Sequence, residues 1–186
     1  ATSCGLEVNT PMKEAYLVPF MNNRRGGVLE AQLIVGYRGF IKMFLNSPKG
    51  VTLFGAAVRE KDVFDYAYGT SSFLLHKPPM GADDRGEIIA FYACAEMLNH
   101  GKVFIVMSLK DVHHVRDTYS SGYKSAHDKG KDDESPWVSN FEDMGIKTCI
   151  RALEPFIPKS ADIQRALDAD MNIINPKNFP AEWWEE

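Results

Sequence analysis

The sequence predicts an α+β fold in which an antiparallel β-sheet with hairpins packs against helices. Three observations predict this class: short strand-like runs joined by tight polar turns, separate segments with helical spacing of apolar residues, and consecutive strands without the intervening helices of a parallel sheet. The chain has 186 residues, of which 45% are hydrophobic and 25% charged. This size and balance suffice for one compact domain with its own core.

The N-terminal part is predicted to contain a strand, a turn, a second strand and a helix. Residues 14–20 and 28–36 have the apolar pattern of strands, and the Arg-Arg-Gly-Gly segment at residues 24–27 forms the turn between them. After Gly36 the period becomes helical. Pro48 then ends the helix. The residues that share its predicted face are Tyr37, Phe40, Ile41, Phe44 and Leu45.

Two hairpins are predicted in the middle of the chain. In the first, residues 51–60 and 63–68 are joined by the polar link of Lys61 and Asp62. In the second, residues 87–98 and 102–109 flank a loop of Asn99, His100 and Gly101. A further strand-like stretch, SFLLHK, ends at Pro78.

The C-terminal part is predicted to be helical with one long loop. Residues 111–119 have a helical pattern, whereas residues 120–135 are polar and contain glycine, which predicts a mobile surface loop. Pro136 then begins a helix at its favoured first position, with Ser135 as the cap. The apolar stripe expected on this helix consists of Val138, Phe141, Gly145, Thr148, Cys149 and Ala152.

A single domain is expected over residues 1–171. Its last element is a short helix at residues 162–170, and residues 172–186 form a loosely held acidic tail. The first residues do not resemble a signal peptide, and no apolar run approaches the roughly 20 residues of a membrane span. The three cysteines are widely spaced and odd in number, which indicates free thiols in a reducing cytoplasm.

The net charge of −4 hides an uneven distribution. Residues 20–61 carry seven basic against two acidic residues, a balance of +5, while residues 160–186 carry two basic against six acidic residues, a balance of −4. A basic N-terminal half favours an anionic partner such as nucleic acid. An uneven, merely solvated surface is the alternative interpretation.

The sequence contains no recognisable catalytic or cofactor motif. It has neither a GxSxG nucleophile segment nor a GxxxxGK phosphate loop. His113 and His114 are adjacent, so on a helix they point about 100° apart and are poorly placed to bind one metal ion. The carboxylates of residues 132–134 are more typical of a solvated loop than of a metal site. We therefore expect no cofactor, no metal and no bond-making chemistry.

Basic and aromatic residues are the remaining candidates for function, because cations track phosphates and aromatic rings stack bases. Lys147 and Arg151 are four residues apart and share a helical face. Pairing of Arg151 with Glu154 and of Lys147 with Asp143 is the alternative, as is a packing role for Tyr37 and Trp137. The candidate DNA-binding residues are Arg24, Arg25, Tyr37, Arg38, Lys42, Lys110, Arg116, Trp137, Lys147 and Arg151.

Five blocks of the sequence resemble, in order and spacing, the RecT family of phage single-strand DNA annealing recombinases. The blocks are AYLVPF, AQLIVGYRGFIKMF, VREKDVFDYAYG, PWVSNFEDMGIKTCIRAL and IPKSADIQRAL. The resemblance extends roughly over residues 3 to 168. The family's N-terminal helical segment is expected to be missing here, and its C-terminal extension is expected to be reduced to the acidic tail.

The resemblance implies a fold distantly similar to eukaryotic single-strand annealing proteins and an ATP-independent activity without cofactors. The implied partners are single-stranded DNA, the annealed duplex intermediate, further copies of the chain in a ring or helical filament, and a phage exonuclease or host single-strand binding protein. The implied location is the cytoplasm of a bacterial host, and no membrane is involved. Two alternatives stay open: a metal-dependent hydrolase that uses His113, His114 and residues 132–134, and an oligomeric structural assembly protein.

Overall fold

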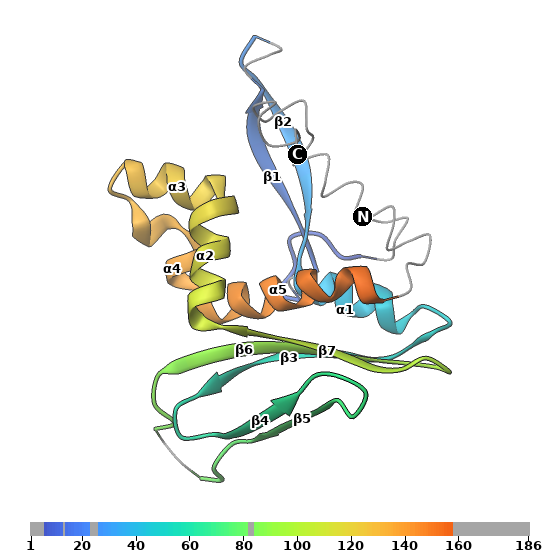
Figure 1. The fold of residues 1–186 in the computed structure, drawn as a ribbon. Helices are drawn as coiled ribbons and strands as arrows, with labels where there is room; N and C mark the ends of the chain where they lie inside the picture. Colours follow the sequence, from blue (N-terminus) through green and yellow to red (C-terminus); the bar gives the residue numbers. More distant parts are fainter. Residues whose placement is uncertain (1–5, 13, 23–25, 82–83, 158–186) are drawn as a thin grey trace, which may run out of the picture. The chain divides into compact units, whose positions relative to one another are not determined.

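The computed structural model describes residues 6–12, 14–22, 26–81 and 84–157 (Figure 1). The chain divides into two compact units, one of residues 1–51 with 158–186 and one of residues 52–157. Antiparallel strands and helices occur in both, which confirms the α+β class. Within the described ranges, no helix is long and apolar enough to cross a membrane.

The first unit contains the predicted strands and helix near the N-terminus. Strands β1 (Ala15–Asn22) and β2 (Val28–Val35) pair antiparallel, with Ala15 opposite Val35 and Asn22 opposite Val28. Helix α1 (Tyr37–Leu45) follows Gly36 directly and buries Phe40, Met43 and Phe44. The change from alternating to helical spacing at Tyr37 therefore marks the end of the hairpin correctly.

Glu14 joins the start of β1 to α1. Its side chain accepts hydrogen bonds from the backbone N–H of Glu7 and from Nζ of Lys42, both at 2.9 Å, and these bonds lower the pKa of Glu14. Gly39 allows the close approach that this arrangement needs, because a Cβ there would lie 2.2 Å from the carbonyl oxygen of Glu14. A side chain at residue 39 would push α1 away from β1.

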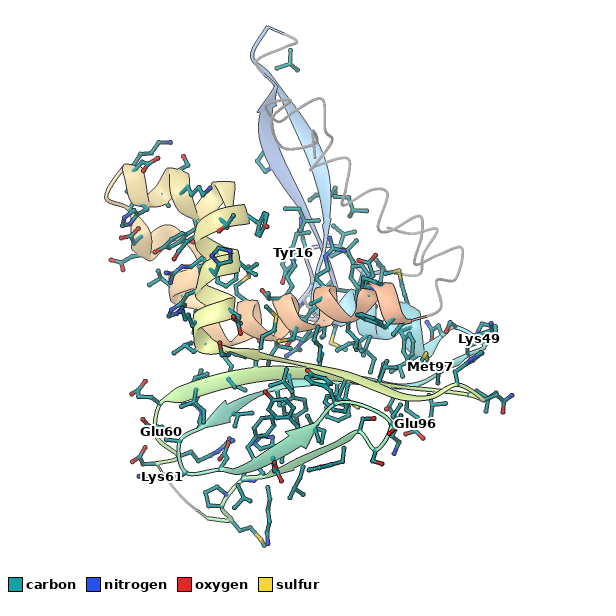
Figure 2. The ribbon with its side chains drawn as sticks, viewed as in Figure 1. Tyr16, Lys49, Glu60, Lys61, Glu96 and Met97 are labelled. Atoms are coloured by element: carbon teal, nitrogen blue, oxygen red, sulfur yellow. The ribbon has the colours of Figure 1, made fainter. Side chains whose placement is uncertain are left out.

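The second unit has three layers, which Figure 1 shows with α5 on one side of the central sheet and the β4–β5 sheet on the other. The central sheet has the order β3–β6–β7 and consists of β3 (Gly50–Arg59), β6 (Ile88–Met97) and β7 (Gly101–Ser108). The outer layers are β4 (Val63–Ala67) with β5 (Phe73–Lys77), and α5 (Phe141–Leu153). Figure 2 shows the side chains of these layers, with Lys61 at one end and Met97 at the other.

Neighbouring residues of β6 face the two outer layers. A Cβ on Gly145 of α5 would lie 2.4 Å from the ring of Phe91, so helix and strand approach closely there. The next residue, Tyr92, points to the opposite face and stacks on Phe64 of β4 with 5.8 Å between ring centroids. Because side chains alternate along a strand, the consecutive residues Phe91 and Tyr92 contact α5 and the β4–β5 sheet, respectively.

The predicted pairing of residues 51–60 with 63–68 is wrong, since β3 pairs with β6 and β4 pairs with β5. Lys61 and Asp62 do form a turn, in which the N–H of Asp62 donates to the carbonyl of Arg59. The N–H of Glu60, however, donates to the carbonyl of Glu87 at 3.1 Å, just before β6. The turn therefore sends β4 into another layer instead of folding it back onto β3.

The second predicted hairpin is confirmed. Strands β6 and β7 pair antiparallel, with Met97 opposite Gly101. Asn99 and Gly101 have positive φ angles of 63° and 76°. Asparagine and glycine tolerate this conformation best, which explains their occurrence at the tip.

Residues 120–135, predicted as a mobile surface loop, contain helices, so the prediction of a loop is wrong. Helix α2 (Leu109–Tyr119), predicted correctly, is followed by α3 (Ser121–Asp128) and the short η3 (Asp132–Glu134). Tyr123 of α3 lies under the guanidinium of Arg116 at 4.5 Å from the ring centroid. A contact between helices therefore stabilises a segment whose composition alone indicates no structure.

The helix predicted from Pro136 is two helices. Ser135 accepts a hydrogen bond from the N–H of Trp137 and caps α4 (Pro136–Ser139), as predicted, but Asn140 then leaves the helical conformation. Val138 is 46% exposed and does not belong to the buried stripe. The short η4 (Glu154–Phe156) follows α5, and the predicted helix at 162–170 lies outside the described residues.

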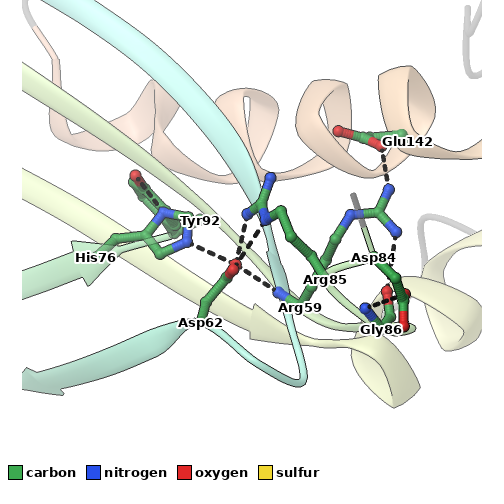
Figure 3. Close-up of polar contacts among 8 residues, drawn as sticks. All are labelled: Arg59, Asp62, His76, Asp84, Arg85, Gly86, Tyr92 and Glu142. Carbon is green, nitrogen blue, oxygen red and sulfur yellow. Dashed lines mark hydrogen bonds and ion pairs between the residues drawn. The ribbon is translucent and has the colours of Figure 1, made fainter. Parts of the chain in front are cut away.

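A buried carboxylate holds the β4–β5 sheet to the rest of this unit (Figure 3). Asp62 has no exposed side-chain surface and accepts two hydrogen bonds from Arg85, at 2.9 and 2.5 Å, and one from the backbone of Arg59 at 2.8 Å. His76 lies between Asp62, at 2.9 Å, and the hydroxyl of Tyr92, at 3.2 Å. The tautomer with its proton on Nε2 satisfies both partners. The Arg85 guanidinium holds the pKa of Asp62 well below its usual range.

We expect Asp62→Asn to lower the free energy of unfolding at pH 7 by about 3 kcal/mol, because the variant leaves the Arg85 guanidinium without its charge partner. The folded pKa of Asp62 lies below the unfolded value of about 3.9. The ionised pair therefore stabilises fully at neutral pH and loses its effect as the pH falls below that value. Urea unfolding from pH 7 to acid should show a steeper decline for the wild type than for the variant.

The control is Lys61→Ala, which removes the exposed pair between Lys61 and Asp84. It should unfold at the same urea concentration as the wild type. Equal stability of Asp62→Asn and the wild type at pH 7 would show that the network does not hold the layers together.

Candidate nucleic-acid interface

Lys147 and Arg151 lie on the side of α5 that is turned away from the central sheet. Cys149, Ile150 and Leu153 are buried and mark the side of the helix that packs inward. Each of the two cations is two residues from Cys149, which places both about 160° around the helix from that side chain. The structure therefore brings this predicted pair onto one face, one turn apart.

Arg151 also has an acidic neighbour. Its Nη1 lies 3.5 Å from Oε2 of Glu154, as the alternative interpretation of this residue predicts. Arg151 is 24% exposed on its side chain, and Lys147 is partly buried. Glu154 is 19% exposed on its side chain, so this pair is partly shielded from solvent. A phosphate would have to compete with Glu154 for the guanidinium.

The two predicted cations of α2 do not form a common face. Lys110 is exposed, and Arg116 lies six residues later, on a different side of the helix. Nε of Arg116 donates to Asp117 at 2.7 Å, and this bond raises the pKa of the guanidinium. Together with its contact to Tyr123, this gives Arg116 a part in holding α3 against α2.

Trp137 is a packing residue in this structure. It is 7% exposed, its Nε1–H donates to Oγ of Ser120 at 3.0 Å, and its ring lies 6.4 Å from that of Phe141. These contacts match the packing alternative for this residue. A DNA contact by Trp137 stays a prediction.

In the first unit, the structure brings Tyr37 and Arg38 together at the start of α1. Nε of Arg38 donates to the Tyr37 hydroxyl at 3.3 Å, and Arg38 is exposed. Lys42, on the same helix, forms its ion pair with Glu14. Arg24 and Arg25 lie outside the described residues.

Two of the residues proposed for the hydrolase alternative, His113 and Asp132, contact side chains outside that proposed set. His113 lies 5.3 Å from the ring of Phe141, whereas His127 pairs with Asp132 at 3.0 Å. In the described part of the chain, no group of three or more His, Cys, Asp or Glu residues could hold a metal ion. Burial raises the pKa of the Cys149 thiol to about 12, so this thiol stays protonated at neutral pH and is a poor nucleophile.

Sequence reasoning missed a series of aromatic residues between the β4–β5 sheet and the central sheet. Tyr66 lies 5.5 Å from Tyr68, and Tyr68 stacks on Phe104 of β7 at 5.1 Å. The signal was present, because Phe64, Tyr66 and Tyr68 alternate along the chain and so share one face of a strand. Tyr66 and Tyr68 are 42% and 56% exposed, so part of this face is accessible to a ligand.

The sequence is similar to known proteins over most of its length. It matches the RecT family over residues 1–180. It is 35% identical over 167 residues to Protein RecT of Escherichia coli strain K12, an alignment that includes 89% of this chain and 58% of that protein. The chain therefore spans less than two thirds of the length of this relative.

We expect Trp137→Phe to lower the free energy of unfolding by about 1–2 kcal/mol, because it removes a buried hydrogen bond and part of a packed ring. Urea unfolding measures this, with Val138→Ala at the exposed neighbouring position as the control. Unchanged stability together with weakened DNA binding would give Trp137 a contact role instead.

Proposed function

Since the chain belongs to the RecT family, we propose that it binds single-stranded DNA and anneals complementary strands without ATP, as a step of phage-type homologous recombination. The observation that carries this proposal is the position of Lys147 and Arg151 on one face of α5, on the side away from the central sheet. They lie in one of the sequence blocks that resemble the family. The proposal includes the other predicted contacts, with Tyr37, Arg38 and Lys110 next in weight because Arg38 and Lys110 are exposed.

Annealing requires cationic side chains and no catalytic groups, because no covalent bond is made or broken. Two DNA strands repel each other through their phosphates, and a protein that neutralises these phosphates lowers the barrier to pairing. The hydrogen-bonding edges of the bases must stay accessible to the incoming strand. Protein contacts should therefore go to the DNA backbone, which gives little sequence preference.

Further copies of the chain are proposed to assemble along the DNA in a ring or helical filament, in the cytoplasm of a bacterial host. A phage exonuclease that produces single strands, or a host single-strand binding protein that covers them, is the proposed additional partner. Residues 1–171 are proposed as the annealing core and residues 172–186 as an acidic tail. The alignment includes 58% of Protein RecT. The annealing activity of the whole protein is therefore also a proposal.

We expect Lys147→Ala combined with Arg151→Ala to leave the melting temperature nearly unchanged and to lower DNA affinity at least tenfold, which is about 1.4 kcal/mol. For single strands, log affinity falls with log salt by about 0.7 for each neutralised phosphate, so losing two contacts should make the slope shallower by about 1.4. Fluorescence anisotropy with a labelled oligonucleotide across a salt series measures both quantities.

The matched control is Lys129→Ala combined with Lys131→Ala, which removes the same charge from exposed positions between α3 and η3. It should bind nearly as the wild type does. Equal losses for both double variants would mean that only overall charge matters, and a flat salt titration of the wild type would reject phosphate binding altogether.

Annealing should proceed unchanged in EDTA and without nucleotide. The sequence has no phosphate loop, and the proposed contacts are made by protein cations. The rate at which two labelled complementary strands pair, followed by energy transfer between their dyes, tests this. A requirement for ATP or a divalent ion would point to the hydrolase alternative.

A further inference from the structure

A pocket of about 400 Å³ lies along β7, the edge strand of the central sheet. Its walls include Tyr68 and Ser72 from the segment between β4 and β5, Lys102 and Phe104 from β7, and Phe156 from η4. This volume is within the range of small-molecule sites. Tyr68 and Phe156 are 56% and 64% exposed, so the pocket opens to solvent with aromatic rings at its surface.

Tyr68 is exposed and yet held in place. Its hydroxyl accepts a hydrogen bond from the N–H of Val106 at 2.9 Å. Its ring stacks on Phe104 with an interplanar angle of 15° and meets Tyr66 edge-on. An aromatic ring fixed in this way loses little conformational entropy when a planar ligand stacks on it.

The pocket favours a ligand with negative charge. Lys102 is the one charged residue among those that line it. Its side chain is 67% exposed and forms a long ion pair of 3.4 Å with Glu96, near the end of β6 in Figure 2. Such an exposed pair is weak, so the ammonium can turn to a phosphate at the mouth of the pocket.

Addition of a peptide strand to β7 fits this site less well. The backbone N–H of Val106 points away from β6. In an antiparallel pair, the backbone N–H and C=O groups that point away from the partner strand recur at every second residue. The backbone groups of Phe104 and Lys102 therefore point to the same free edge of β7. The hydroxyl of Tyr68 already occupies the edge at Val106.

From this geometry we propose that the pocket stacks one unpaired base of single-stranded DNA on Tyr68 and Phe156, with the adjoining phosphate near Lys102. The inference rests on the proposed function and adds a second DNA site to it, on a different element from α5. Stacking uses the face of a base and leaves its pairing edge accessible, which is compatible with annealing and independent of sequence.

The test compares two DNA strands and three proteins by equilibrium binding. The strands are an oligothymidylate and an otherwise identical strand of abasic sites. The proteins are the wild type, Phe156→Ala, and Tyr119→Ala as the control, because Tyr119 is 63% exposed on α2 and does not line the pocket. Phe156→Ala should lower affinity for oligothymidylate at least fivefold and leave affinity for the abasic strand and the salt slope unchanged.

A second variant and a photochemical readout keep the test decisive. Tyr68→Leu, checked for folding by its melting temperature, should repeat the base-dependent loss, and an oligonucleotide with 5-iodouracil should crosslink to Tyr68 or Phe156. The inference is overturned if Phe156→Ala binds both strands as the wild type does, or weakens both equally. If the salt slope of the wild type is then still steep, backbone binding stands and only the pocket assignment fails.

Discussion

Asp62 has no exposed side-chain surface and sits in the turn that leads from β3 to β4. A buried carboxylate is stable only when its charge and lone pairs are satisfied, and Arg85, His76 and the turn backbone do so here. Arg85 belongs to the segment before β6 and His76 to β5, so one side chain fixes three parts of the chain. The β4–β5 layer, the aromatic series beneath it and the pocket at the edge of β7 all depend on this placement.

The close packing of α5 on the sheet decides which charges of that helix are available for a partner. Gly145 lets the helix approach Phe91, and the buried Cys149 fixes the rotation about the helix axis. Lys147 and Arg151 then lie on the side of the helix away from the sheet as a geometrical consequence. A bulkier side chain at residue 145 would rotate or lift the helix, and the cationic face would move with it.

Counting basic residues gave candidates, but it could not tell which cations are already engaged. Lys42 is paired with Glu14 across 28 residues of sequence, and Arg116 is held between Asp117 and the ring of Tyr123. The helix at residues 121–128 was not predicted for the same reason, because the contact that holds it, between Tyr123 and Arg116, is not visible in the sequence. Tertiary contacts of this kind leave no periodic signal in a polar segment.

The sequence by itself determined where most strands and helices lie and to which family the chain belongs. Side-chain period distinguishes strand from helix, Ser135 and Pro136 mark a helix start, and the family blocks keep their order. The tertiary structure alone decided that β3 pairs with β6 and that β4 pairs with β5. Alternation shows which face of a strand is apolar but not which strand lies beside it. That choice depends on distant partners such as Asp62 and Arg85, whose attraction appears only when the chain is folded.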